Sequence, residues 1–184
     1  MSDLTPLLPR QEVPPLSAPL VGGGTWSLGD GSPKNFTMVV FYRGLHCPIC
    51  KGYLGSLHKL LDKFTERGVD VVVLSTDSEE RAAKAKQDWN LPNLTIGHSV
   101  SLEAARSWGL YVSNGHGVTS IGIEEPGQFA EPGLFFIRPD GTLYFGATQT
   151  MPFARPHFED LIPALDFVIA KDYPARGEVA ALAA

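Results

Sequence analysis

The chain has 184 residues, 43% of them hydrophobic, and a formal net charge of −5 at pH 7. A chain of this length suits one globular domain, which buries about 70% of the surface that its unfolded form exposes. The composition excludes two classes of protein, because no basic block points to nucleic acid and no stretch approaches the ~20 apolar residues of a membrane span.

The N-terminal segment shows no regular periodicity. Residues 1–35 are rich in Pro and Gly, and the run from Thr25 to Leu28, followed by the turn Gly29 to Gly31, predicts a short hairpin or an irregular arm. The opening stretch, Met1 to Pro15, lacks the basic start and the continuous apolar core of a secretion signal. We therefore expect a cytoplasmic protein.

Four segments carry strand signals, the last weaker than the others: 37–42, 69–74, 134–138 and 142–146. Between the first two, apolar residues recur at helical spacing, and Gly68 ends the run. The second strand is almost continuously apolar, as expected for a strand that is covered on both faces. This arrangement predicts a βαβ unit with parallel strands and a right-handed crossover.

Three further helices are expected after that unit. They run from Glu79 to Trp89 with Asp77 or Ser78 as the cap, from near Ser101 as a shorter helix, and from about Pro156 to Ala170. The residues Arg138 to Gly141 form a β-turn by residue type, and this turn joins two antiparallel strands.

These elements predict an α/β fold, with a mixed central sheet, helices on both faces and an N-terminal hairpin. We expect a single domain over residues 1–184, with a core of about 10–170, a loose arm at 1–12 and a loose tail at 171–184. In such a sheet the site lies beyond the carboxyl ends of the parallel strands, and Cys47 follows the first of them.

Cys47 and Cys50 are the only cysteines, and they form a C-x-x-C motif where a strand gives way to a helix. A helix N-terminus offers unpaired N–H groups and a dipole that favour a thiolate, which is the reactive form of cysteine. We expect Cys47, at the helix end, to be the more exposed and therefore the attacking sulfur, and Cys50, one turn deeper, to be the resolving one. With a peroxide, Cys47 becomes a sulfenic acid that condenses with Cys50. With a disulfide, Cys47 forms a mixed disulfide that Cys50 displaces.

Two other interpretations of the motif stay open beside thiol redox chemistry. A zinc site needs four ligands, and the sequence offers neither a third cysteine nor an H-x3–5-H pair, so we expect no metal. The second interpretation is two ordinary buried cysteines that act as small hydrophobic residues. Redox chemistry is favoured over both on the motif and its context together, because the C-x-x-C follows a strand and opens a helix.

Three basic residues flank the motif: Arg43, His46 and Lys51. Arg43 is the best candidate for stabilising a thiolate, because it stays charged at every working pH and offers five donors. His46 either stabilises the thiolate and carries protons or is simply exposed beside a loop. We predict Arg43 and His46 as catalytic residues together with Cys47 and Cys50.

The run from Phe41 to Cys50 resembles the redoxin group of the thioredoxin superfamily, and most of all the peroxiredoxin-like branch of the alkyl hydroperoxide reductase/thiol-specific antioxidant family. The resemblance covers residues 10 to 170, with these segments similar to the family's N-terminal hairpin, third strand and last hairpin: Pro14 to Leu28, Leu94 to His98, and Glu131 to Gly141. It implies a thioredoxin-like fold. It also implies substrate-binding roles for Tyr42, Gly44 and Pro132, with Pro132 in the place of the cis-proline that faces the active cysteine.

The chain departs from the family pattern at two positions. Gly44 stands three residues before Cys47, where the family carries Thr or Ser, and Tyr144 stands where the family has a second active-site arginine. Arg43 and Arg155 are the residues that would supply the positive charge instead.

The resemblance implies a thiol-dependent peroxidase that reduces hydroperoxides, forms a Cys47–Cys50 bond within one chain and needs no cofactor. A thioredoxin-like or low-molecular-weight thiol would regenerate it. Two alternatives stay open: a thiol–disulfide oxidoreductase acting on disulfide substrates, and a non-catalytic thioredoxin-like module that senses redox state or binds metal. No nucleic acid or membrane is expected as a partner, and a homodimer is left open.

Residues 112–128 form a long insertion before the last hairpin, with four glycines and the pair Glu124 and Glu125. Long loops are often lids or partner contacts, and the alternative is a disordered connection. The neighbouring Tyr111 and Phe129 are candidates to line a pocket.

Overall fold

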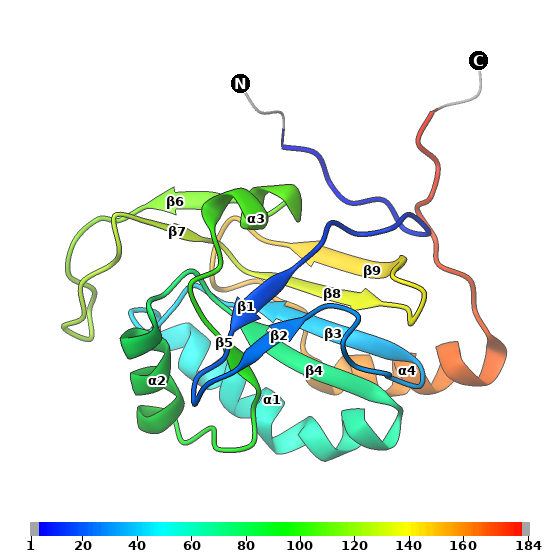
Figure 1. Cartoon of the computed structure of the whole chain (residues 1–184), viewed down its shortest axis with the longest axis horizontal. Coiled ribbons are helices and arrows are strands. Elements are labelled where there is room, and N and C mark those ends of the chain that lie inside the picture. The colour runs from blue at the N-terminus through cyan, green and yellow to red at the C-terminus, as the bar shows by residue number, and fades with distance from the viewer. Residues whose placement is uncertain (1–3, 182–184) are drawn as a thin grey trace.

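The computed structural model describes residues 4–181 (Figure 1). Its elements are β1 (Ser17–Pro19), β2 (Thr25–Ser27), β3 (Phe36–Phe41), α1 (Pro48–Glu66), β4 (Val69–Leu74), α2 (Glu79–Asp88), β5 (Ile96–Gly97), α3 (Leu102–Ser107), β6 (Val112–Asn114), β7 (Gln128–Ala130), β8 (Gly133–Ile137), β9 (Leu143–Thr148) and α4 (Phe158–Lys171). The predicted strands and helices are all present, and most of their ends lie within two residues of the expected positions.

The central sheet has the strand order β5-β4-β3-β8-β9. Strands β3, β4 and β5 run parallel, whereas β8 and β9 are antiparallel to their neighbours. The predicted turn at Arg138–Gly141 joins the last two strands, with the Gly141 N–H donating to the Arg138 carbonyl at 2.9 Å. The predicted mixed α/β sheet is thus confirmed, and its order brings β8 beside the strand that leads to the cysteines.

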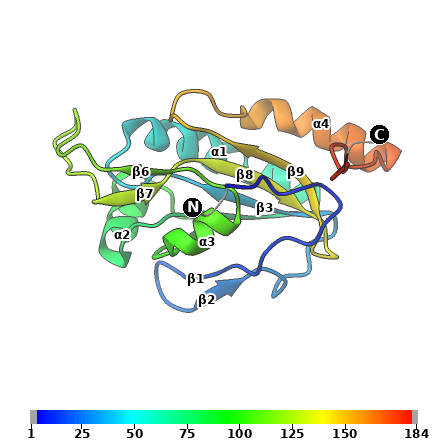
Figure 2. The ribbon, with the colours of Figure 1, turned by 90° about the horizontal axis from the view of Figure 1, so that it is seen from above.

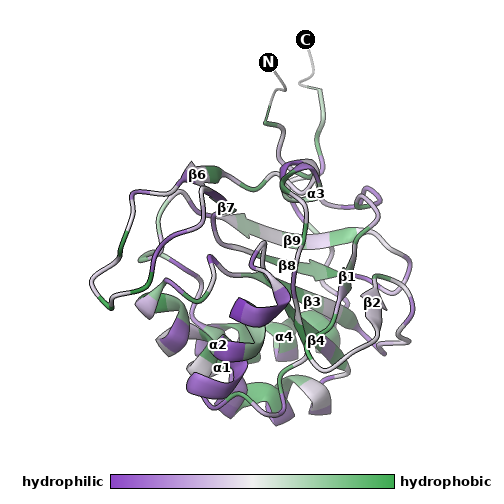
Figure 3. Ribbon diagram, turned by 60° about the vertical axis from the view of Figure 1, so that its left-hand side comes forward, coloured by the Kyte–Doolittle hydropathy of each residue, from purple (hydrophilic) through white to green (hydrophobic). Residues whose placement is uncertain are grey.

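Helices cover both faces of this sheet (Figure 2). Met38 and Val40 of β3 point into a core shared with α1 and α4, whereas Val39 and Phe41 point into a second core with α3 and the N-terminal hairpin. Because successive strand residues alternate between faces, both faces of β3 must be apolar. Figure 3 shows this concentration of hydrophobic residues on the inner strands.

Serine side chains cap the two short helices. Ser78 accepts from the Arg81 N–H at the start of α2, so Ser78 rather than Asp77 is the cap. Ser101 caps α3 in the same way. The last helix begins at Phe158, two residues later than expected, with His157 at its N-cap.

The insertion is folded. It forms a two-stranded antiparallel sheet of β6 and β7, and its loop carries a further bridge between Val118 and Glu124. After α4, Ala175 is buried and its carbonyl accepts from the Arg10 side chain, which also pairs with Glu178 at 3.4 Å. Among the helices of residues 4–181, none has the length and apolar character that crossing a bilayer requires.

Candidate active site

The loop between β3 and α1 is anchored from below by a buried carboxylate. Asp77 accepts from the Leu45 N–H at 2.7 Å and from the Arg81 Nε at 3.0 Å. The loop closes on itself through the Cys47 N–H, which donates to the Gly44 carbonyl. These bonds fix the direction in which the chain enters α1 and therefore the position of the first cysteine.

Gly44 makes that anchor possible. Its φ is +133°, and a Cβ there would lie 2.6 Å from an Asp77 carboxylate oxygen. We expect Gly44→Ala to lower the free energy of unfolding by about 2–4 kcal/mol, because strain and overpacking add. Gly55→Ala is the matched control, since Gly55 lies in α1 with nothing within 4 Å of an added Cβ. Gly55→Ala should instead stabilise by about 0.5–1 kcal/mol in a urea titration. Equal effects of the two variants would contradict this account of the loop.

Both cysteines are free thiols at the N-terminus of α1. Cys47 is the N-cap residue and Pro48 occupies the first turn, where a missing N–H costs no helical bond. The exposed fraction is 1% for Cys47 and 0% for Cys50. Exposure therefore does not distinguish the two sulfurs, contrary to the argument from helix position alone.

Arg155 reaches the cysteines from the loop between β9 and α4. Its Nη2 lies 3.2 Å from the Cys50 sulfur and 3.9 Å from the Cys47 sulfur. The guanidinium stacks over the Tyr53 ring, and its Nε donates to the Pro152 carbonyl. Its buried Nη1 has no protein partner. The positive charge of Arg155 thus lies beside both sulfurs, and its Nη1 has an N–H donor that no atom of residues 4–181 accepts.

Ionisation separates the roles of the two cysteines. The pKa of Cys47 is lowered to about 6, and a hydrogen bond from the Cys50 thiol is the largest cause. Arg155 and then Arg43 lower this pKa further, whereas burial raises it. Burial is the main cause that raises the pKa of Cys50, and the neighbouring Cys47 raises it further. At neutral pH Cys47 is therefore the thiolate and Cys50 the protonated thiol that donates to it.

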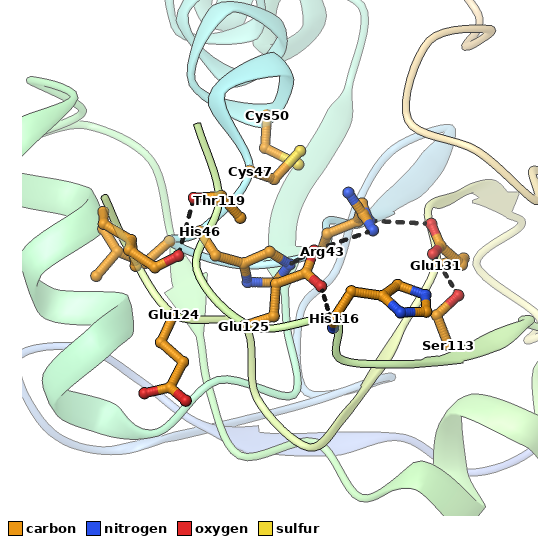
Figure 4. A network of polar contacts seen from close by, with 12 residues as sticks. Arg43, His46, Cys47, Cys50, Ser113, His116, Thr119, Glu124, Glu125 and Glu131 are labelled. Atoms are coloured by element: carbon orange, nitrogen blue, oxygen red, sulfur yellow. Dashed lines mark hydrogen bonds and ion pairs between the residues drawn. The ribbon is translucent and has the colours of Figure 1, made fainter. Parts of the chain in front are cut away.

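Arg43 lies at the centre of a charged network beneath the thiols (Figure 4). Its Nε is 3.2 Å from Glu131 Oε2, and its Nη2 is 3.6 Å from Glu125 Oε1. The guanidinium also stacks over the Phe129 ring at 4.7 Å. Arg43 also lowers the pKa of Cys47, and its effect ranks below that of Arg155.

His46 is fully buried, which excludes the exposed position that the sequence left open. Its ring packs on Phe129 at 4.6 Å, its Nδ1 lies 3.5 Å from the Arg81 Nη2, and its Nε2 lies 4.0 Å from Glu125. Burial lowers the pKa of His46 to about 4, so the ring is neutral at physiological pH. In this state it packs under the loop and carries no charge to offer the thiolate.

The structure also places Tyr42, Pro132 and Tyr144. Tyr42 is buried, and burial is the main cause that raises the pKa of its hydroxyl. The peptide bond before Pro132 is trans, which corrects the cis geometry expected there, and the Pro132 carbonyl accepts from the Gln149 N–H. Tyr144, on β9, donates to the Tyr173 carbonyl.

Several members of the site could not be found from sequence patterns. Nothing in the sequence indicates that Asp77, Glu125 and Glu131 meet at the loop before α1, and Tyr53 looks like any apolar position of that helix. Only the glutamate pair in the insertion and the missing family arginine hinted at Glu125 and Arg155. Within residues 4–181, no group of three His, Cys, Asp or Glu side chains has a geometry that would hold a metal ion.

Three comparisons with known proteins bear on this site. The model of the AhpC/TSA family matches residues 9–145. A search of curated proteins finds no significant match.

Solved structures share the fold at low identity. The peroxidoxin BcpB of Mycobacterium tuberculosis superposes with a TM-score of 0.68 at 17% identity, covering 88% of this chain and 98% of its own. The reduced 2-Cys peroxiredoxin of Plasmodium vivax has a TM-score of 0.72 at 16% identity, covering 91% and 84%. A peroxiredoxin-like protein from Aquifex aeolicus gives a TM-score of 0.69 at 15% identity, covering 90% of each chain. These likenesses establish a thioredoxin-type fold.

Proposed function

This chain belongs to the AhpC/TSA family of thiol-dependent oxidoreductases, and on that premise we propose that it reduces hydroperoxides with Cys47 as the nucleophile and Cys50 as the resolving thiol. One observation carries the proposal: the Cys47 sulfur lies at a helix N-terminus, accepts from the Cys50 thiol and has Arg155 beside it. Such a sulfur is ionised at neutral pH and ready to attack an electrophilic oxygen.

The reaction proceeds in two steps at these sulfurs. The Cys47 thiolate attacks the terminal oxygen of the hydroperoxide, the O–O bond breaks, and the leaving alkoxide takes up a proton to become an alcohol or water. Cys47 is then a sulfenic acid. The Cys50 thiol condenses with it, so that an S–S bond forms within the chain and water departs. We propose that the Nη1 of Arg155, which is buried and has no hydrogen-bond partner among the described residues, donates to the oxygen that carries developing charge.

Two electrons must then come from an external thiol. We infer a thioredoxin-type or low-molecular-weight thiol as the reductant, in a cytoplasmic setting where thiols stay reduced. We infer that this thiol attacks the Cys47 sulfur, which lies at the helix N-terminus. A homodimer is compatible with this scheme but is not needed for it.

The direct test is the second-order rate of Cys47 oxidation by hydrogen peroxide and by an organic hydroperoxide, followed in stopped flow. We expect rapid oxidation whose rate rises with pH through a midpoint near 6, because only the thiolate reacts and its pKa is about 6. Reduction of insulin disulfides by the same protein should be slow. A protein that reduces insulin but does not consume peroxide would be a thiol–disulfide oxidoreductase. Inertness in both assays, with an ordinary thiol pKa, would indicate a non-catalytic module.

A further inference from the structure

The loop of the insertion, residues 115–127, is attached to the body of the protein mainly by polar contacts. None of its side chains is fully buried, in contrast to Phe129 just beyond it. Arg81 donates to the Glu124 carbonyl at 3.1 Å, and Glu125 pairs with Arg43. A loop without a core of its own is thus held against the active-site loop by charge.

Glu125 is the residue that makes this attachment specific. Only 10% of its side chain is exposed, and its Oε2 accepts from the His116 N–H at 2.8 Å while its Oε1 faces Arg43. The neighbouring Glu124 is less enclosed, and Figure 4 shows its side chain directed away from the cysteines. A nearly buried carboxylate is unfavourable unless it is paired, so Glu125 and Arg43 depend on each other.

Arg43 also has a second anionic partner that keeps it in place. Glu131 Oε2 lies 3.2 Å from the Arg43 Nε, and the other Glu131 oxygen accepts from Ser113 at 2.6 Å. Neutralising Glu125 therefore leaves the guanidinium anchored by Glu131 and by the Phe129 ring. What changes is the amount of positive charge that Arg43 presents toward the thiols.

We propose that the insertion is a working part of the active site, and that Glu125 tunes the reactivity of Cys47 through Arg43. Glu125 touches no reacting atom and is a positioning residue for the guanidinium. The proposal rests on the role of Cys47 as the nucleophile. Titratable and charged groups face these atoms from every neighbouring element: Cys50 and Arg155 at Cys47, Glu131 at Arg43, and His46 with Arg81 and Asp77 beneath the loop.

The sign of the effect follows from charge. Arg43 favours the thiolate of Cys47. The Glu125 carboxylate lies 3.6 Å from the Arg43 guanidinium, so its negative charge should offset part of that effect. Glu125→Gln keeps the shape and the acceptor for the His116 N–H but removes the negative charge. The thiolate should then form at lower pH, with the midpoint of Cys47 alkylation displaced downward by about half a pH unit. At pH 5 this displacement makes alkylation about two- to threefold faster.

The experiment measures iodoacetamide alkylation of Cys47 against pH in the full chain, with peptide mass spectrometry to score each cysteine separately. Glu124→Gln is the matched control and should leave the profile unchanged, because its side chain points away from the cysteines while the backbone carbonyl that Arg81 uses remains. Glu125→Asp keeps the charge and should restore the wild-type midpoint. Thermal melts of each variant confirm that the fold is retained.

Coupling through Arg43 is tested by a double-mutant cycle. In an Arg43→Met background, Glu125→Gln should shift the midpoint much less than in the wild-type chain. An equal shift in both backgrounds, or an unchanged profile for Glu125→Gln, would overturn the proposal. The readout uses no peroxide, so a failure of the peroxidase assay and a failure of this cycle are separate results.

Discussion

Cys47→Ser is expected to abolish all reaction with peroxide, whereas Cys50→Ser should permit one oxidation and then stop. Cys47 is the ionised sulfur and Cys50 the protonated one, so only the first can attack an O–O bond. Mass spectrometry after one equivalent of hydrogen peroxide should show a sulfenic acid, or its trapped adduct, on Cys47 of the Cys50→Ser chain. The wild-type chain should instead lose two hydrogens as the disulfide forms.

The same samples contain their own control. Cys47→Ser retains Cys50, whose raised pKa keeps it protonated and inert, so this variant should remain unmodified on the same time scale. A non-reducing gel should show monomers for the oxidised wild-type chain. Comparable adducts on both single variants would contradict the assignment of attacking and resolving sulfurs. A covalent dimer as the main wild-type product would contradict a disulfide within one chain.

Arg155→Met is expected to slow the oxidation of Cys47 by about 10²-fold, which is the scale of losing one preorganised donor at a developing charge. The methionine keeps much of the apolar stem that packs near Tyr53 but removes the cation beside both sulfurs. The pKa of Cys47 should rise as well, because Arg155 is one of the groups that lower it. Stopped-flow oxidation and thiolate absorbance against pH measure the two effects.

Variants of two other arginines serve as comparisons for Arg155→Met. Arg43→Met should slow oxidation less than Arg155→Met, because Glu125 and Glu131 already share the charge of Arg43. Arg106→Met removes an exposed arginine of α3 and should change nothing. If the Arg155 variant retained the wild-type rate with an intact melting curve, the donor role of Arg155 would have to be abandoned.

The sequence predicted the fold and the position of the motif well, because both depend on local patterns. The apolar run of β4 and the helical spacing from Leu54 to Phe64 each report burial in a regular element. Cys47 follows the first parallel strand, and the topology alone then places it at the edge where sites form. Residue type also named Ser78 as one of two candidates for the cap of α2, the other being Asp77.

The partners of the thiols could not be predicted in the same way. Arg155 was named only as a substitute for the missing family arginine. It lies 108 residues after Cys47, in a loop without periodicity, and only the folded chain brings the two together. The burial of Cys47 was missed for the same reason, since helix position says nothing about which distant segment covers the sulfur. Arg43 was correctly placed near the site. The two glutamates that pair with it come from distant segments: Glu125 lies in the insertion, and Glu131 follows β7.

The wide separation of Cys47 and Arg155 has a consequence for a chain that is still being made. Synthesis proceeds from the N-terminus, so both thiols leave the ribosome long before the residue that lies against them. Until that arginine has docked, Cys47 lacks its nearest cation and a larger share of it remains protonated. Full reactivity is therefore acquired only after Arg155 has been made and has docked, and until then the nascent protein carries a less oxidisable cysteine.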